Sequence, residues 1–220
     1  MKICVVTDRK MQFKSRLPAC DVALFPFGTL SEINYSDELS GKSEKLETLA
    51  KYSGAAGCGV LCGCITDSRG IRRKSVAAAS NGRLLGIADM LNVLDGEEFK
   101  SGAGLGVYAI GGYKVGLCID GDLFFPECVQ TLAMCGCNLI AVHCESVGDG
   151  MIPVLVRAYA YLYGIPVALC CTNTAYFADV TGVMACSNQD VAVFEASPKN
   201  CYRLVTSRRR GLLANTTSDF

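Results

Sequence analysis

Short apolar runs separated by polar turns recur along the whole chain and predict β-strands. The runs have the length of strands, about 4–8 residues, and are shorter than most helices. The expected strands are 3–7, 22–25, 59–65, 75–79, 84–87, 105–110, 114–119, 139–142, 167–171, 183–186, 191–194 and 202–206. Asn81-Gly82 and Gly111-Gly112 each separate two of these runs. Such pairs tolerate the positive φ angles of tight turns, so both sites predict β-hairpins.

Three stretches carry apolar residues at helical spacing instead. In the first, 39–52, a single face is expected to carry Leu39, Leu46, Leu49 and Ala50. The second begins at Pro126, and proline suits the first position of a helix. The third runs over 153–163 and ends at Gly164, a typical C-terminal cap. Hairpins mixed with a few helices predict an α/β domain whose sheets have one face on the core and one under helices.

The length of 220 residues fits one domain. We expect that domain to span 1–207, followed by a polar C-terminal tail at 208–220. The tail begins with Arg208-Arg209-Arg210, the one dense basic cluster. Three charges are fewer than a usual nucleic-acid patch, so a solvated segment is the preferred interpretation.

The composition limits the kinds of binding partner that can be expected. The chain has 21 basic and 21 acidic residues and a pI near 6.6, which gives no electrostatic reason to expect nucleic acid or an anionic membrane. The apolar run near the N-terminus is too short for a signal sequence or a membrane span. We therefore expect a cytoplasmic protein.

Fourteen cysteines raise the question of a metal centre. Cys58, Cys62 and Cys64, with Cys135 and Cys137, form the nearest approach to a ligand cluster, but the chain has no CxxC pair and one histidine. Zinc and iron–sulfur sites need closely spaced ligands, as in a CxxC pair. We therefore expect no metal and no other cofactor. In a reducing compartment free cysteine behaves as a small buried hydrophobe.

The segment 114–127 resembles the central motif of the nitrilase, or carbon–nitrogen hydrolase, superfamily. That motif is a strand ending in Cys-x-Asp, followed by Phe-Pro-Glu at a helix start. Weaker similarities follow in the family's order and cover about 3–196. The matching positions are Phe25-Pro26, 75–86, 99–102, Gly116, Ile119, Asp122, Phe125, Pro126, Glu127, Gly136, 138–140, Arg157-Ala158 and Asn173.

The resemblance implies a four-layer α-β-β-α sandwich that forms homodimers. It also implies hydrolysis of amides or nitriles by a catalytic triad of Glu, Lys and Cys. Here the three family positions fall on Phe27, Ala88 and Asp120. A nucleophile needs a base and the oxyanion needs a fixed cation, and none of these side chains fills its family role. A further family glutamate falls on Glu97 or Glu98.

The leading hypothesis is therefore a homologue without classical amidase activity, with a binding or assembly role and an amide-like small-molecule ligand. The candidate pocket comprises Asp120, Gly121, Asp122, Cys144, Glu145 and Glu97. The alternative is an active amide hydrolase with a rearranged nucleophile such as Cys144 beside Glu145. We interpret Cys118 as a core residue, and His143 as pointing away from Cys144, because neighbours on a strand face opposite sides.

Two further expectations concern the pocket and the first helix. An acidic cluster of Asp120, Asp122 and Glu145 that holds Mg²⁺ or Ca²⁺ is one interpretation, and a structural role of Asp122 in the turn is the preferred one. Only about fourteen residues separate the first two expected strands, where the family places a long helix. We expect that helix to be shortened or absent.

Overall fold

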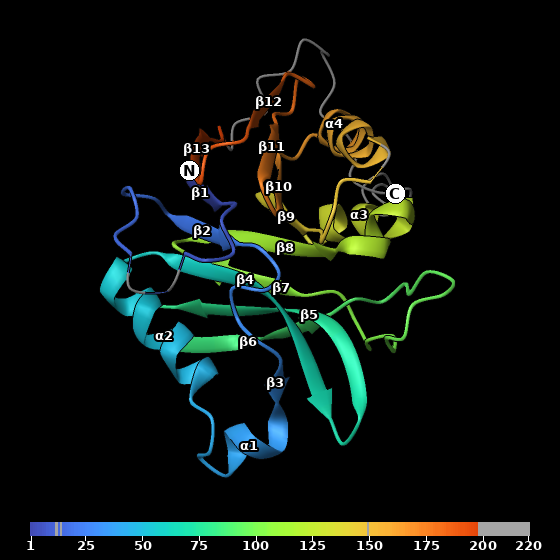
Figure 1. The fold of residues 1–220 in the computed structure, drawn as a ribbon. Helices are drawn as coiled ribbons and strands as arrows, with labels where there is room; N and C mark the ends of the chain where they lie inside the picture. Colours follow the sequence, from blue (N-terminus) through green and yellow to red (C-terminus); the bar gives the residue numbers. More distant parts are fainter. Residues whose placement is uncertain (12, 14, 149, 198–220) are drawn as a thin grey trace, which may run out of the picture.

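The protein is described by a computed structural model covering residues 1–197 except 12, 14 and 149. Two β-sheets pack face to face (Figure 1). The first has the order β13-β1-β2-β4-β5-β6, with β3 paired to β4. Its strands are β1 (Lys2–Val6), β2 (Val22–Phe25), β3 (Ile33–Asn34), β4 (Gly59–Ser68), β5 (Ile71–Ser80), β6 (Arg83–Asp89) and β13 (Val191–Glu195).

The second sheet has the order β12-β11-β10-β9-β8-β7. Its central strands β8, β9 and β10 are parallel, and its edges are antiparallel hairpins. The strands are β7 (Val107–Ile110), β8 (Tyr113–Ile119), β9 (Leu139–His143), β10 (Val167–Cys171), β11 (Thr174–Ala178) and β12 (Met184–Ser187).

The longer helices cover the outer faces of the sheets. Helix α2 (Lys45–Ala56) packs on the first sheet, and α3 (Pro126–Met134) and α4 (Met151–Tyr163) pack on the second (Figure 1). A five-residue helix, α1 (Tyr35–Leu39), and a 3₁₀ turn, η1 (Asp120–Phe124), lie in connections. Helix α4 ends at Gly164, whose φ of +61° is the left-handed conformation expected of a glycine cap.

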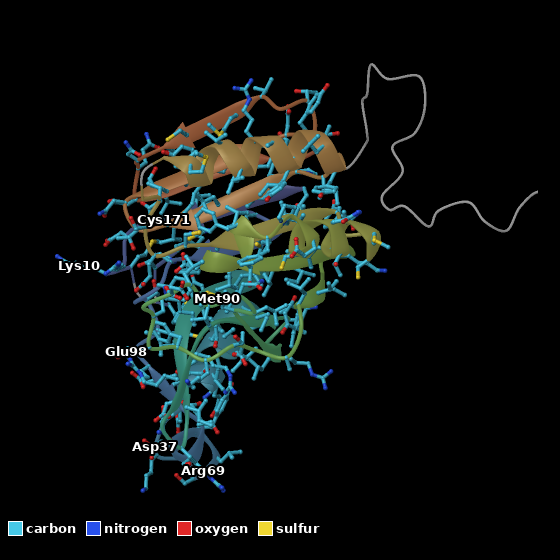
Figure 2. The ribbon with its side chains drawn as sticks, turned by 90° about the vertical axis from the view of Figure 1, so that its right-hand side faces the viewer. Lys10, Asp37, Arg69, Met90, Glu98 and Cys171 are labelled. Atoms are coloured by element: carbon cyan, nitrogen blue, oxygen red, sulfur yellow. The ribbon has the colours of Figure 1, made fainter. Side chains whose placement is uncertain are left out.

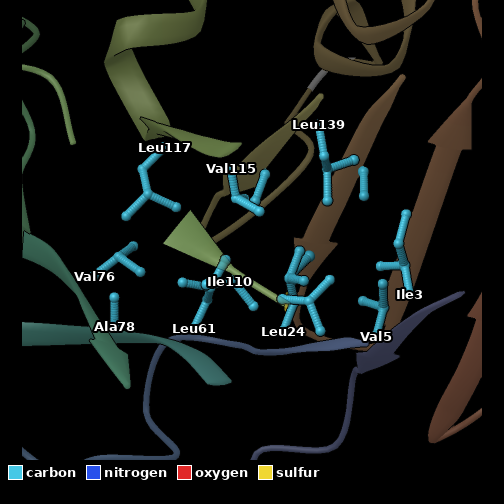
Figure 3. Close-up of a cluster of buried hydrophobic side chains, with 14 of the residues drawn as sticks. Ile3, Val5, Leu24, Leu61, Val76, Ala78, Ile110, Val115, Leu117 and Leu139 are labelled. Atoms are coloured by element: carbon cyan, nitrogen blue, oxygen red, sulfur yellow. The ribbon is translucent and has the colours of Figure 1, made fainter. Parts of the chain in front are cut away.

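The central core lies between the sheets, where strand alternation directs one apolar face of each (Figure 3). Ile3, Val5 and Leu24 of the first sheet face this core, as do Val115 and Leu139 of the second. Two further cores lie under α2 and under α3 with α4. The fold is thus the expected four-layer α-β-β-α sandwich. Between β1 and β2 the described residues contain no helix, as expected from the short connection.

Several local expectations differ from the structure. The helix expected at 39–52 begins at Lys45, and Leu39 is exposed instead of buried. A break at Ser40-Gly41 is responsible, since Gly41 adopts φ +73° and ends α1. Strands β3 and β11 and helix α1 were not expected. The expected strand 202–206 and the tail 208–220 lie outside the described residues.

Strands β4 and β5 form a longer hairpin than expected. Their pairing continues to Ser68 and Ile71, whereas β6 pairs only with the Ser75–Ser80 part of β5. The outer part therefore projects as a two-stranded arm, joined by β3 and α1; the labelled Asp37 and Arg69 mark its end in Figure 2. Lys74 lies where this arm leaves the sheet. No helix within the described residues is long and apolar enough to cross a lipid bilayer.

Candidate functional site

Strand β8 ends in a sharp elbow at Asp120. Asp120 has φ +43°, a left-handed backbone conformation that is uncommon outside glycine, asparagine and aspartate and that clusters at functional positions. Gly121 follows, and a Cβ at this position would collide with the carbonyl oxygen of Asn92. The close approach of the loop after β6 therefore requires glycine here. The elbow presents the Asp120 side chain at the end of the strand.

Asp122 holds this loop against the elbow. One carboxylate oxygen accepts hydrogen bonds from the backbone N–H groups of Leu91 at 2.9 Å and Asn92 at 2.8 Å, and from the Asn92 side-chain amide at 3.0 Å. The other oxygen accepts from the N–H of Ile119 at 3.4 Å. The acidic cluster considered for Asp120, Asp122 and Glu145 is therefore wrong, because Asp122 is committed to backbone donors. No group of three or more His, Cys, Asp or Glu in the described ranges is arranged to hold a metal ion.

Lys74 occupies the centre of the site. Its Nζ lies 2.6 Å from Asp120 Oδ2, 2.6 Å from Glu97 Oε1 and 3.4 Å from Glu145 Oε2. The lysine side chain is only 5% exposed, and its Nζ lies 5.2 Å from the centre of the Phe99 ring. One buried ammonium is thus shared by three carboxylates, two of them within hydrogen-bond distance.

This arrangement corrects the expectation that Asp120 would lack a cation. Lys74 is on β5, the strand beside β6, and the β5–β6 register pairs Val76 with Ala88. Lys74 shares its strand face with Val76 and Ala78, which point into the central core. That alternation was the available signal, but Lys74 lies one residue before the strand expected at 75–79.

The other two positions assigned by the resemblance are apolar parts of the core. Phe27 is 3% exposed and packs against Gly63, where a Cβ would meet the Phe27 backbone nitrogen at 2.9 Å. Ala88 is buried, and its methyl group faces Gly106. Neither side chain has a group that can take up or release a proton.

The electrostatics of the site follow from burial and crowding. Burial raises the pKa of Asp120, and Glu97 and Glu145 raise it further, while the ion pair with Lys74 opposes the increase. Burial by itself would lower the pKa of Lys74, but Asp120 and Glu97 outweigh it, so the net pKa is raised. Lys74 is therefore held in its charged ammonium form, and its surroundings make Asp120 a weaker acid than an ordinary aspartate.

The thiols near the site are buried. Cys144 and Cys118 are fully buried, and burial raises the pKa of each thiol well above its usual value. Cys118 is a core residue, as expected. Cys144 packs in the core under the helices, whereas the neighbouring Leu139 and Ala141 of β9 face the central core on the parity of His143. His143 and Cys144 therefore point to opposite faces, and no Cys–His pair forms between them.

A cavity of about 220 Å³ adjoins the cluster through Glu145. Phe27 forms one wall, and Arg9, Ser31 and Glu32 supply polar groups. Two larger hollows, of about 450 and 510 Å³, lie beside Phe13 and α2 and contain none of the cluster residues. The candidate pocket thus brings together Asp120, Glu97 and Glu145, with Lys74 added, and leaves Asp122 and Cys144 as supporting structure.

Solved structures share this architecture. A cysteine-to-alanine mutant of the Nesterenkonia AN1 amidase from the nitrilase superfamily superposes with a TM-score of 0.68 and 17% identity, over 88% of each chain. The same kind of mutant in complex with butyramide gives a TM-score of 0.66 and 18% identity, over 84% of this chain and 85% of that one. A third structure, a glutamate-to-glutamine mutant with acrylamide added at the active-site cysteine, gives 0.66, 17%, 84% and 87% respectively.

No protein-family model and no curated protein sequence matches the chain. The structural similarity defines the class of fold: the chain has the nitrilase-superfamily, or carbon–nitrogen hydrolase, fold.

Proposed function

We propose that the chain is a nitrilase-fold protein without classical amidase activity that binds a small amide-like ligand. The observation that supports this most directly is the Asp120–Lys74 ion pair at the elbow after β8. A carboxylate is a poor nucleophile toward an amide carbonyl, and here its charge is already engaged by the ammonium. Phe27 supplies no base to activate an alternative group.

Hydrolysis through a relocated thiol is the second candidate, because Cys144 is close enough to the site for Asp120 and Lys74 to influence its pKa. The thiolate is the reactive form of cysteine, and burial holds Cys144 in the neutral form. We therefore favour the non-hydrolytic role.

Ammonia release tests the absence of hydrolysis. The purified chain is incubated with butyramide or acetamide, and we expect no ammonia above that of a heat-denatured control. Ammonia production that disappears in Cys144→Ser would establish the second candidate, and production that disappears in Asp120→Ala would establish a carboxylate nucleophile. Iodoacetamide labelling provides an independent measurement, since a catalytic thiol would react far faster than the buried ones.

Ligand binding is proposed for the cavity beside Glu145. Its apolar Phe27 wall and its polar Ser31 and Glu145 side chains fit a small amide, which needs both an apolar surface and hydrogen-bond partners. Butyramide is the probe, because the structurally similar amidase is described in complex with it.

We expect butyramide to bind the wild type in calorimetric titration and Ser31→Trp to lose binding, because the indole would fill the cavity. Ser40→Trp is the matched control, since Ser40 is exposed at the end of α1 and lines no part of the cavity. Equal heats for both variants would refute the assignment of the cavity, and absence of binding to the wild type would refute the ligand class.

We also propose a homodimer and a cytoplasmic location. Helix α4 has exposed apolar side chains, with Val154 57% and Leu162 61% exposed, and apolar helical faces of this kind form subunit interfaces. The described cysteines are all free thiols, which suits a reducing compartment. Sedimentation should show a dimer that dissociates in Leu162→Lys. Ile71→Lys, which places the same charge on the arm, should leave it intact, and a monomeric wild type would refute the proposal.

A further inference from the structure

The Lys74–Asp120 pair has the components of a condensation reaction. The amine nitrogen and the carboxyl oxygen are 2.6 Å apart, and Glu97 contacts the same nitrogen from another side at 2.6 Å. The lysine side chain is 5% exposed, the aspartate 15% and the glutamate 23%, so the three groups have little contact with water. Phe99 covers the ammonium, with its ring centre 5.2 Å from Nζ.

From this geometry we propose that Lys74 and Asp120 form an intramolecular isopeptide bond, with Glu97 as the proton carrier. The bond would join β5 of the first sheet to the elbow after β8 of the second. It goes beyond the proposed binding role and does not depend on it.

Each atom of the reaction is supplied by the three side chains. The neutral Lys74 amine attacks Cγ of the protonated Asp120 carboxyl group, forming the C–N bond. Glu97 accepts a proton from the nitrogen and delivers it to the departing hydroxyl group, which leaves as water. One C–N bond forms, one C–O bond breaks and one water molecule is released. No oxidant, reductant or other co-reactant is required.

The crowding of carboxylates favours the reactive protonation state of the acid. One ammonium offsets only one of the three negative charges, so a proton on Asp120 relieves repulsion from Glu97 and Glu145. Burial acts in the same direction, and it raises the pKa of Asp120. The ion pair itself can exchange a proton from Nζ to Oδ2, which yields the neutral amine and the acid together.

Positioning lowers the barrier that two free groups would meet in solution. Well-oriented intramolecular reactions reach effective concentrations of about 10⁵–10⁸ M, and the 2.6 Å contact holds the amine and the carboxyl group in such an arrangement. The raised pKa of Lys74 keeps the amine protonated most of the time and makes the reaction slow. We therefore expect the bond to accumulate over a prolonged incubation of the folded chain.

Intact-mass spectrometry of the full chain, reduced and denatured after incubation, tests the proposal. The wild type should lose the mass of one water, and proteolytic mapping should recover one branched fragment that contains both Lys74 and Asp120. Lys74→Arg and Asp120→Ala should keep their full masses. Glu97→Gln should retain the native circular dichroism spectrum and form the bond at least tenfold more slowly.

A competing dehydration has to be separated from the bond. Asp120 precedes Gly121, and an Asp-Gly pair can lose water by closing a succinimide on its own backbone. Succinimide formation would persist in Lys74→Arg and would give no branched fragment, so that result would overturn the proposal. A wild type that keeps its full mass throughout would also overturn it. Butyramide binding is read separately, so failure here leaves the binding proposal standing.

Discussion

At the scale of single residues, the site is organised by one lysine that the family motif does not include. Asp120 and Asp122 could be placed from the sequence because the motif around them fixes their positions on the strand and the following turn. Lys74 could not be placed that way, since its role depends on a contact across 46 positions of sequence. Its parity with Val76 and Ala78 was visible, but a charged residue on a buried face is the exception.

Replacing Lys74 by methionine should destabilise the fold. Asp120 and Glu97 would then face each other without a cation, and breaking a buried ion pair in this way costs about 3–5 kcal/mol. Urea unfolding at neutral pH measures the free energy of unfolding. The loss should shrink as the pH falls, because protonation removes the repulsion, and Asp120 takes up its proton before an ordinary aspartate does since its pKa is raised.

Lys51→Met is the matched control, because Lys51 pairs with Glu47 on the exposed face of α2. Exposed pairs of this kind contribute little to stability, because solvent screens them. If both variants were as stable as the wild type, the Lys74 cluster would not contribute to the stability of the fold.

His143 should make stability depend on pH. Burial lowers its pKa to about 4, from an ordinary value of 6.5, with the nearby backbone of Leu61 opposing in part. The unfolded chain therefore binds the proton first as the pH falls. The contribution of neutral His143 to the free energy of unfolding is fully present above about pH 6.5. It is lost as the pH falls toward 4, and the loss is about 3 kcal/mol for this pKa shift.

Measuring urea midpoints between pH 7 and pH 4 in wild type and in His143→Gln isolates this contribution. Asp120, whose pKa is raised, has the opposite slope and is common to both proteins. Identical pH profiles for the two proteins would show that His143 titrates normally.

At the scale of elements, turns and caps that depend on local sequence could be predicted, whereas strands that depend on long-range pairing could not. The Asn81-Gly82 turn and the Gly164 cap were found because their own backbone angles require those residues. Strand β3 was missed because it has two residues and exists only by pairing with β4. The extension of the β4–β5 hairpin was missed for a similar reason, as its polar outer residues lack an apolar alternation.

The elbow between β8 and α3 should depend on Asp122. Asp122→Ala would leave the N–H groups of Leu91 and Asn92 without their acceptor, and each buried unsatisfied donor costs about 1–3 kcal/mol. We expect a loss of about 2–4 kcal/mol in the free energy of unfolding, measured by chemical denaturation. Asp95→Ala, at an exposed position of the same loop, should change it little. Equal effects of the two substitutions would contradict the role given to Asp122.

At the scale of the whole molecule, apolar patterning and chemistry follow different requirements. The four layers need only volume and alternation, which Phe27 and Ala88 still provide as core residues. Catalysis needs particular atoms at particular places, which is a stricter requirement than volume and alternation. This is why the architecture could be predicted from the sequence, whereas the arrangement around Lys74, which depends on a contact between distant strands, could not.

The burial of the thiols has a consequence for refolding. Most of the described cysteines lie inside the cores as unreactive neutral thiols. Once the chain unfolds, the ten buried sulfhydryl groups of the described residues become accessible together and can cross-link at random in air. Thermal melting should therefore be reversible with a reductant present and irreversible without one, because the fold itself shields these sulfur atoms from oxygen until it opens.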